Sequence, residues 1–491
     1  MVVVGNLGLD NVRNWLPEPG VVWLWQPSPA TVANARDAPI SAVPPSYIQA
    51  RHLRRFAEQT AKGLDMSRLL VIAFDMLGHC DIRTMTYVIN AHLRRHDTYR
   101  SRFAISGARQ IVRHTMTDPG AIEMQPVERG VMTPNQWQEY ILSTPSPLDW
   151  DCFRFGVIQH DDHFTVCISI DHIHFDATFL GTIFLEIREM YNTLMDGGEP
   201  IPLSKAGSYA EYCLREHAYT SALTLDSPEV RQWIEFLENN DGSFPAFPLP
   251  LGDTSRLTAG EVLSLQLLDA HQTADFEAAC TRAGVRFSGG VFACAALTEY
   301  ELAGAETYYA VTPTGTRSTP AEFVTSGWFI GHLPLAVPVG DSFGETARGA
   351  QAAFDSRAHL ARVPFERVLE LAPRLAAPLS RGCFPMLSFL DAGVPPLSAV
   401  FAPHIRTANT RVFSDGRIAA RVCMWVNRFH EETTVTASFP DSPIAHESVR
   451  RYLEAMKSVY VRVAEGRGDV RQRRATALSF SGNGNDGLFP G

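Results

Sequence analysis

The stretch FTVCISIDHIHFDATFLGTIFLEI, residues 164–187, contains the change of hydrophobic period that decides the fold class. Apolar side chains occupy every second position of residues 164–171, which is the period of a half-buried β-strand. After Asp176 the apolar residues fall three or four positions apart, the stripe of an amphipathic helix. The pattern predicts a strand, a loop at residues 171–177 and a helix. Loops at the carboxyl ends of strands commonly carry functional side chains, so this loop is the first candidate for a site.

The composition describes a folded, acidic protein. Of the 491 residues, 45% are apolar and 20% are charged, as in a globular chain that buries a large core. The 43 Lys and Arg residues are outnumbered by 53 Asp and Glu residues, which gives a net charge of −10. Such a chain lacks the basic surface of a general nucleic-acid-binding protein, so nucleic acid is not expected as a partner.

No segment predicts membrane insertion or export. The sequence has no run of about 18 uncharged apolar residues, and residues 1–15 lack the basic start and small-residue cleavage site of an export signal. We therefore expect a cytoplasmic protein. The eight cysteines are scattered singly without a CxxC pair, which predicts buried free thiols rather than a zinc ribbon or a redox pair. No cofactor is expected.

Both hydrophobic periods break near the middle of the chain. Residues 239–253, NNDGSFPAFPLPLGD, contain three prolines and several turn-forming residues. This break predicts an N-terminal lobe at residues 1–238, an inter-lobe linker at 239–258 and a C-terminal lobe at 259–465, each lobe mixing helix and strand. Residues 466–491 are charged and then rich in Gly and Asn, which predicts a mobile tail.

The loop at residues 171–177 supports more than one interpretation. His172 suits general-base chemistry, because the unperturbed pKa of histidine, about 6.5, lies near operating pH. Asp176 can brace the loop, but it can equally cap the helix that follows while His172 packs as a core residue. A third interpretation is a metal site, because His172, His174 and Asp176 stand at alternating positions and are all common ligand types.

The metal interpretation departs from the pattern it most resembles. The metallo-β-lactamase pattern HxHxDH has a histidine where this chain has Ala177. A second group of potential ligands precedes the strand, at residues 160–163, HDDH. A polar hairpin turn is the simpler interpretation of that group.

Six further motifs occur with the loop in a fixed order. They are SYIQARHL (46–53), RHDTYRSRF (95–103), YAEY (209–212), TGTRSTP (314–320), GWFIGHLPLAV (327–337) and VPFERVLE (363–370). Together with the loop they resemble the condensation-domain and chloramphenicol-acetyltransferase-like superfamily, whose signature is HHxxxDG. The matches run from Ser46 to about Pro440, or 395 of the 491 residues.

Within that superfamily the chain is similar to the mycobacterial polyketide-associated protein (Pap) acyltransferases, in particular the subgroup that acylates trehalose glycolipids. The segments that carry this similarity are APISAVPPSYIQARHLRRF (38–56), INAHLRRHDTYRSRF (89–103), FSGGVFACAAL (287–297) and MWVNRF (424–429). The resemblance implies an α/β fold of two chloramphenicol-acetyltransferase-like lobes with a central tunnel. It also implies that the acyl thioester enters from one face and the hydroxyl-bearing acceptor from the other, with no covalent acyl-enzyme.

Residue by residue, Asp171 takes the first His of the signature, His172 the second, Asp176 the Asp and Ala177 the Gly. The resemblance implies that His172 is the general base and that Asp176 is structural, pairing with Arg317 from the other lobe. Two departures from the signature, Asp171 and Ala177, bear on the expected rate of acyl transfer. A carboxylate that met the base would favour imidazolium and oppose its action, and a methyl in place of Gly would add strain if the backbone needed a positive φ.

The remaining site residues are expected around the tunnel. The motif at 327–337 implies that Trp328 and Phe329 lie near it, and Asp171 is a third tunnel candidate. His174 falls in the variable part of the signature, so no catalytic role is expected for it. No metal is expected in this reading.

The implied function is O-acyl transfer. A long-chain or polyketide acyl group would move from acyl-CoA, an acyl carrier protein or a polyketide synthase to a hydroxyl of trehalose or a related glycolipid. A monomer is expected, and the apolar products are compatible with peripheral membrane association at the inner face of the plasma membrane. Two alternatives stay open: a metal-dependent hydrolase that uses His172, His174 and Asp176, and a catalytically silent member of the fold that binds a carrier protein or lipid.

Overall fold

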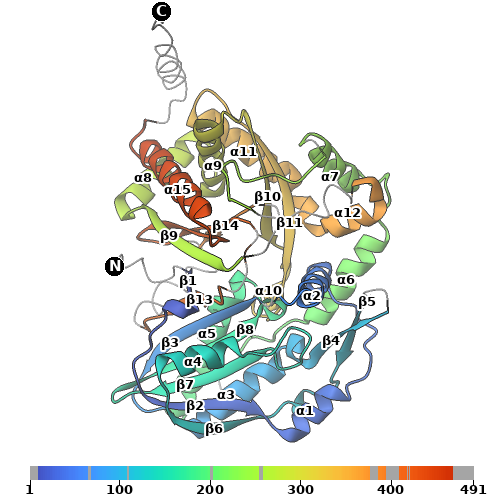
Figure 1. Ribbon diagram of the computed structural model, residues 1–491, viewed down its shortest axis with the longest axis vertical. Helices are drawn as coiled ribbons and strands as arrows, with labels where there is room; N and C mark the ends of the chain where they lie inside the picture. The colour runs from blue at the N-terminus through green and yellow to red at the C-terminus, as the bar shows by residue number, and fades with distance from the viewer. Residues whose placement is uncertain are drawn as a thin grey trace, which may run out of the picture.

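Two α/β lobes lie one above the other in the computed structural model of the protein (Figure 1). The described residues are 9–64, 68–107, 110–199, 203–240, 242–253, 258–375, 385–393, 408–416, 419 and 421–467. The tail predicted at 466–491 lies outside them from position 468 onward.

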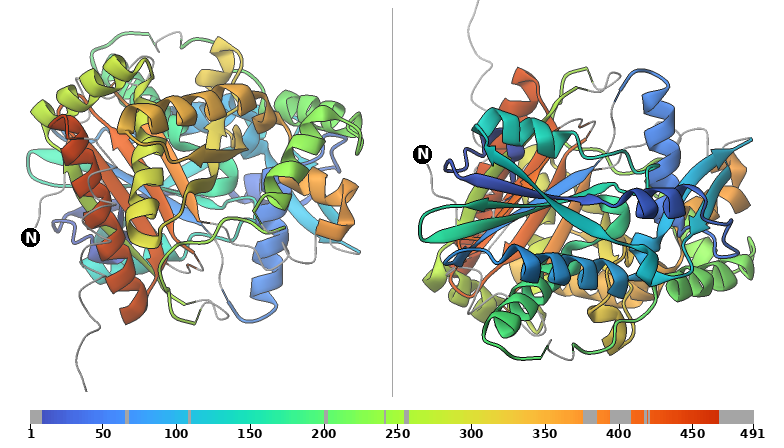
Figure 2. Two further views of the ribbon diagram at one scale, coloured as in Figure 1. Left: turned by 90° about the horizontal axis from the view of Figure 1, so that it is seen from above. Right: turned by 90° about the horizontal axis from the view of Figure 1, so that it is seen from below.

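The first lobe is built on a twisted seven-stranded sheet, which Figure 2 (right) shows from below. In spatial order its strands are β1 (Leu9–Asn11), β13 (Arg411–Ser414), β3 (Leu69–Leu77), β8 (His163–Asp171), β7 (Phe153–Gln159), β2 (Val21–Pro27) and β6 (Met124–Val131). A separate hairpin pairs β4 (Ser101–Ser106) with β5 (Gln110–Thr115). The helices are α1 (Pro29–Arg36), α2 (Tyr47–Thr60), α3 (Ile82–Arg95), α4 (Pro134–Leu142), α5 (Ala177–Met195) and α6 (Tyr209–Ser221).

The predicted strand and helix around the histidine loop are β8 and α5, but β8 is covered on both faces rather than half-buried. It lies between β3 and β7, antiparallel to both. Helices α3 and α5 pack over the face that includes Phe164, and α4 covers the face where Cys167 and Trp137 share a core. Polar residues are tolerated there because they have partners: Ser169 Oγ lies 2.9 Å from Thr144 Oγ1.

The second lobe combines a four-stranded sheet, a two-stranded sheet and a layer of helices. The first sheet has the order β12 (Met386–Asp391), β14 (Cys423–Arg428), β15 (Thr433–Pro440) and β9 (Gly260–Leu268), and β10 (Thr307–Gly315) pairs antiparallel with β11 (Ile330–Pro338). The helices are α8 (Ala270–Ala283), α9 (Phe287–Ala303), α10 (Pro320–Phe323), α11 (Phe343–Arg357), α12 (Phe365–Leu371) and α15 (Pro443–Ala464). Helix α15 packs along β9, α8 and α9 (Figure 2, left).

The packing of the lobes departs from the predicted boundaries at two elements. Helix α7 (Pro228–Glu238) falls within the predicted N-terminal lobe, yet Trp233 and Phe236 are part of the core of the second lobe. Strand β13 falls within the predicted C-terminal lobe, yet it pairs with β3 and β1 in the first sheet. Strand β13 therefore connects the C-terminal half of the chain to the sheet of the first lobe. The linker at 239–258 stays a prediction.

No described helix is long and apolar enough to cross a membrane.

Candidate active site

Backbone hydrogen bonds hold the turn that follows β8. The strand ends at Asp171, residues His172–His174 form a single 3-10 turn (η4), and α5 begins at Ala177. The His172 N–H donates to the Arg68 carbonyl at 2.9 Å, and the Ile173 N–H donates to Asp171 Oδ1 at 3.0 Å. The position of the histidine is therefore set by the main chain.

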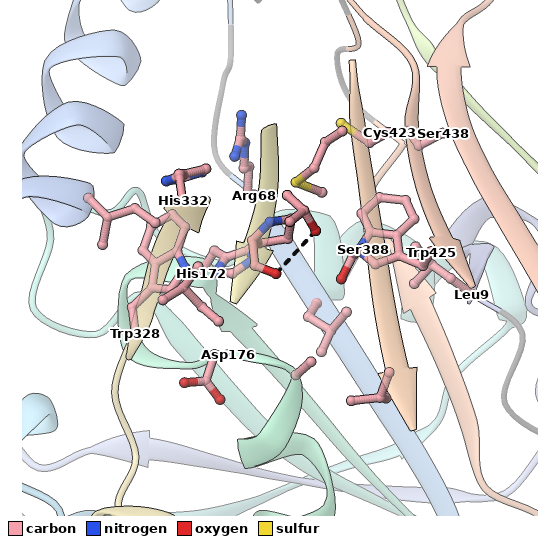
Figure 3. Close-up of a pocket in the computed structure, with 18 of the residues that line it drawn as sticks. Leu9, Arg68, His172, Asp176, Trp328, His332, Ser388, Cys423, Trp425 and Ser438 are labelled. Atoms are coloured by element: carbon pink, nitrogen blue, oxygen red, sulfur yellow. Dashed lines mark hydrogen bonds between the residues drawn. The ribbon is translucent and has the colours of Figure 1, made fainter. Parts of the chain in front are cut away.

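A cavity of about 410 Å³ opens between the lobes next to this turn. Its wall combines residues of α2 and the β8–α5 turn with residues of β10, β11, β12 and β14. His172, Asp176 and Trp328 are part of that wall (Figure 3). Both lobes therefore contribute to the cavity.

The His172 imidazole is half-buried between two aromatic rings. Its centroid lies 4.1 Å from that of Trp328 and 4.5 Å from that of Phe175, and both pairs are stacked. Nδ1 is enclosed and has no hydrogen-bond partner among the described residues. Nε2 is not enclosed in this way. Because the half-buried ring lines the cavity, Nε2 is the nitrogen that faces it.

The surroundings keep this imidazole neutral. Burial, together with the positive charge of Arg68, lowers the pKa of His172 to about 3. Asp171 opposes this shift only weakly. At neutral pH the ring therefore has one nitrogen with a free lone pair, and the solvent-accessible Nε2 can act as a proton acceptor.

The carboxylate of Asp171 points to a different histidine, His52 of α2. Asp171 Oδ1 lies 3.1 Å from His52 Nε2. Burial alone would raise the pKa of Asp171, but its interactions with His52 and with the Ile173 N–H outweigh burial and the pKa lies below its usual value. Asp171 is fully buried and is not part of the cavity wall, so it is not the tunnel residue predicted. Successive residues at a strand end point to opposite sides, which separates this carboxylate from the His172 imidazole.

Asp176 joins the turn to the second lobe. Its Oδ2 accepts hydrogen bonds from Arg317 Nη2 at 2.8 Å and from the Phe329 N–H at 3.0 Å. Its Oδ1 accepts from the Thr178 N–H at 3.0 Å, as a helix cap does. The Arg317 and Asp176 side chains are 3% and 2% exposed, so this is a buried inter-lobe ion pair. Both interpretations of Asp176, the brace and the cap, describe contacts that are present.

Arg317 and the two aromatic residues after Gly327 form one unit. Arg317 Nη1 donates to the Thr325 carbonyl at 2.8 Å, and its guanidinium carbon lies 4.2 Å from the centroid of the Phe329 ring. Trp328 lines the cavity. Phe329 is fully buried against Tyr209 and is not part of the wall, because its ring fills the space under the arginine.

Ala177, which replaces the Gly of the signature, adds no backbone strain. Among the residues that the structure describes, Asn409 is the only non-glycine residue with a positive φ. Ala177 is the first residue of α5 and lines the cavity. Its methyl group therefore narrows the passage without distorting the turn.

The alternating set His172, His174 and Asp176 does not converge. His174 is fully buried, with Nδ1 3.0 Å from Thr98 Oγ1 and Nε2 3.2 Å from Cys152 Sγ. Asp176 is engaged by Arg317. Because both are bound by protein groups away from the His172 ring, this set has no common point for a metal ion.

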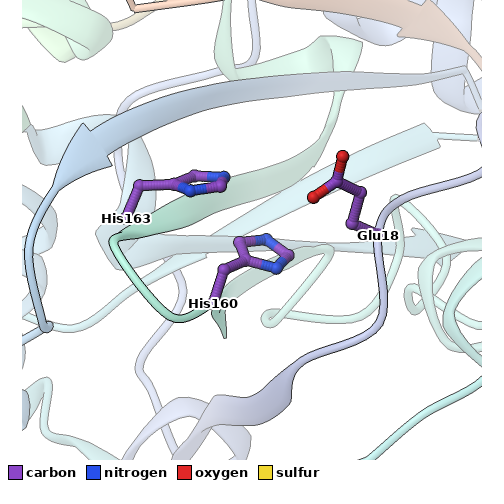
Figure 4. Close-up of side chains that lie close together, drawn as sticks. All are labelled: Glu18, His160 and His163. Carbon is purple, nitrogen blue, oxygen red and sulfur yellow. The ribbon is translucent and has the colours of Figure 1, made fainter.

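Residues 160–163 form the hairpin turn between β7 and β8, as predicted. His160 and His163 stack at 4.4 Å and lie close to Glu18 (Figure 4). His163 Nδ1 is 2.7 Å from Asp162 Oδ1, and His160 Nε2 is 3.2 Å from Thr165 Oγ1. None of these residues is part of the wall of the inter-lobe cavity.

Sequence reasoning misses several polar residues of the cavity wall. These are Arg51, Arg55, Arg68, Arg421 and His332. Arg51 and Arg55 stand four apart on α2, a helical spacing that could have indicated a shared face. His332 lies inside the motif at 327–337, but no role is predicted for it. Arg68 and Arg421 precede strands without any periodic signal, so only the fold brings them to the site.

An apolar extension of about 170 Å³ adjoins the cavity and shares Leu70, Phe175 and Trp425 with it. The remainder of its wall is mainly apolar and includes Ile72 and Phe184. Such a wall suits a hydrocarbon group and offers little to a sugar.

Two α/β lobes that enclose a cavity, with an HxxxD turn in its wall, are the features expected of the condensation-domain family. The condensation-domain family matches residues 42–379, and the chain belongs to that family. The chain is an acyltransferase, because relatives about 50% identical to it over most of its length are named as acyltransferases.

One relative is the 2'-acyl-2-O-sulfo-trehalose (hydroxy)phthioceranyltransferase PapA1 of Mycobacterium tuberculosis, 51% identical over 97% of this chain and 92% of the relative. Another is the trehalose-2-sulfate acyltransferase PapA2 of Mycobacterium bovis, 52% identical over 93% of this chain and 97% of the relative. A solved structure of a PapA2 acyl transferase matches with a TM-score of 0.90 and 52% identity, covering 93% of this chain and 99% of that one.

Proposed function

We propose that the protein transfers an acyl group from a thioester to a sugar hydroxyl of a trehalose-based glycolipid, with His172 as the general base. The observation that supports this most is the neutral His172 imidazole, whose Nε2 faces a cavity lined by both lobes. The trehalose acceptor is supported by the names of the two relatives. Acyl-CoA or a carrier protein as donor, work at the inner face of the plasma membrane and a monomeric state stay predictions.

The mechanism follows from the position of Nε2. The acceptor hydroxyl oxygen attacks the thioester carbon while Nε2 takes the hydroxyl proton. The tetrahedral intermediate then expels the thiolate, which receives the proton from the imidazolium, so an ester and a free thiol leave. Holding both substrates in one cavity makes the encounter nearly unimolecular.

The low pKa of His172 is compatible with this role because the positive charge on its ring forms together with a negative charge on the substrate. The imidazolium arises at the same time as the oxyanion of the tetrahedral intermediate, so the net charge of the enclosed site does not change. Attraction between the two opposite charges offsets the burial that lowers the pKa of His172. The apolar extension beside Phe175 would receive the acyl chain.

Product analysis tests the proposed function directly. The purified protein is offered acyl-CoA donors of different chain length with trehalose, its 2-sulfate and other sugars, and the products are identified by mass spectrometry. We expect an O-acyl trehalose ester together with one free thiol per ester. Release of free fatty acid without any ester would contradict the proposal and favour hydrolysis.

The acid limb of the pH profile should lie far below the usual range for histidine. Because the neutral form of His172 is the reactive one and its pKa is about 3, kcat/KM should not fall as the pH decreases from 8 to 5. The measurement uses an acyl-pantetheine donor, which has no phosphate that titrates in this range. An inflection near pH 6.5 would show that the base is an unperturbed histidine in a different environment.

Metal removal should leave acyl transfer unchanged. His174 and Asp176 are engaged by Cys152 and Arg317 rather than directed to a common point. Treatment with EDTA followed by gel filtration should therefore not alter the rate. A loss of activity that Zn²⁺ or Fe²⁺ restores would favour the hydrolase alternative instead.

A further inference from the structure

Four arginine side chains converge on the cavity wall, and we call them the arginine cluster: Arg51, Arg55, Arg68 and Arg421. Arg51 and Arg55 lie one turn apart on α2. Arg68 precedes β3, and Arg421 lies two residues before β14. Figure 3 shows Arg68 on the same side of the cavity as His332, above His172. Three separate segments thus bring positive charge to one wall.

The wall contains more positive than negative charge. Of the described residues that line the cavity, four are Arg and two are Asp. One of these aspartates, Asp176, is paired with Arg317. Arg51 has a carboxylate partner, Glu366, at 2.8 Å. Arg68 makes no side-chain hydrogen bond or ion pair with any residue in the described part of the chain.

The guanidinium groups repel one another. Burial, with the charges of Arg421 and Arg55, lowers the pKa of Arg68 to about 10. Burial also lowers the pKa of Arg51, and Arg421 and Arg55 contribute in the same direction. Half-buried like charges of this kind are stabilised when an anion binds between them.

The cluster lies beside the base. The Arg68 carbonyl accepts the N–H of His172 at 2.9 Å, and the Arg68 guanidinium is close enough to influence the imidazole electrostatically. A molecule that presents its reacting group to His172 can therefore place a second group at the cluster.

We propose that the arginine cluster is a subsite for an oxyanion, a sulfate or phosphate monoester carried by one of the two substrates. The inference rests on the proposed function, because it assumes that a sugar and a thioester meet at His172. Guanidinium groups bind tetrahedral oxyanions through paired N–H donors in a planar fork. A sulfate ester would put the anion on the acceptor, whereas the phosphates of CoA would put it on the donor.

Kinetics of Arg68→Gln test the subsite and identify the source of the anion. KM is measured for trehalose 2-sulfate against trehalose, and for acyl-CoA against acyl-pantetheine. Losing one charge-assisted interaction should raise the KM of the anionic member of one pair by about 10- to 100-fold, and leave its uncharged counterpart unchanged. Arg68→Lys keeps the charge and should recover part of the loss. Arg54→Gln, an exposed arginine of α2 outside the cavity wall, is the matched control.

The two possible selective results name the source. A rise confined to trehalose 2-sulfate places the anion on the acceptor, and a rise confined to acyl-CoA places it on the donor. If all four KM values change by one common factor, if none changes, or if kcat alone falls, the subsite does not exist.

A binding measurement separates failure of the subsite from failure of the proposed function. Inorganic sulfate, compared with chloride at equal ionic strength, should raise the Tm of the unmodified protein and of Arg54→Gln more than that of Arg68→Gln. Equal stabilisation of all three proteins would overturn the inference even if acyl transfer is observed. Selective stabilisation would support it even if no trehalose acceptor is acylated.

Discussion

Replacing His172 with alanine should reduce kcat/KM for acyl transfer by about 10²- to 10⁴-fold, the usual contribution of a general base. The reaction would retain the cavity and the positioning of both substrates, so the activity should not fall to zero. The fold should survive, because the ring is half-buried and its enclosed Nδ1 has no hydrogen-bond partner to lose among the described residues. The measurement is steady-state kinetics with the donor and acceptor that give the fastest turnover.

The control for His172→Ala is a histidine outside the cavity. His160 lies on the hairpin between β7 and β8, and His160→Ala should keep the full rate. Circular dichroism and Tm establish that both variants are folded. Near-normal turnover by folded His172→Ala would remove the basis for the assignment of the base.

Replacing Arg317 with methionine should lower the free energy of unfolding by about 3–5 kcal/mol, because it leaves the buried Asp176 carboxylate without its cation. It also removes the guanidinium group that bridges Asp176 of the first lobe and the Thr325 carbonyl of the second. Activity should fall as well, since Asp176 holds the Phe329 backbone beside Trp328. Urea denaturation, with the rate of acyl transfer as a second readout, measures both effects.

A double variant and an exposed pair distinguish the buried charge from general damage. Asp176→Asn combined with Arg317→Met leaves no unpaired charge and should recover part of the stability. Arg36→Met breaks an ion pair of the same length, 2.8 Å, whose members are 73% and 65% exposed, and should leave the stability unchanged. Equal losses in Arg317→Met and Arg36→Met would contradict the inter-lobe role of the buried pair.

The local part of the fold could be predicted from the sequence because local patterns determine it. The change of period around residues 164–187 predicts β8 and α5, and the position of the histidine turn follows from them. The burial of the second face of β8 could not be read this way, since its hydroxyl and thiol side chains resemble those of an exposed face. Their partners come from distant segments, such as Thr144 for Ser169.

The alternating metal set fails for a geometric reason. The spacing of His172, His174 and Asp176 suggests one shared face only if the chain is extended. The chain instead forms a 3-10 turn at His172–His174, which directs side chains two positions apart to different sides. His174 is therefore directed to Thr98 and Cys152.

Contacts between distant segments determine the parts of the fold and of the site that the sequence does not indicate. Strand β13 has four residues, too few for a periodic signal, yet it completes the first sheet. The amphipathic pattern of α7 shows that one face is buried but not which lobe covers it. Likewise, Arg68 and Arg421 are 353 positions apart, and only the meeting of the lobes puts them on one wall.

A single-turnover experiment tests the central claim most directly. Excess enzyme is mixed with radiolabelled acyl thioester and trehalose or its 2-sulfate, and the ester formed is quantified by rapid quench, so that only the chemical step is observed. For His172→Gln we predict the same ester, formed at least about 10²-fold more slowly than by the unmodified enzyme and with unchanged substrate affinity. Formation of that ester by folded His172→Gln at the unmodified rate would contradict the account.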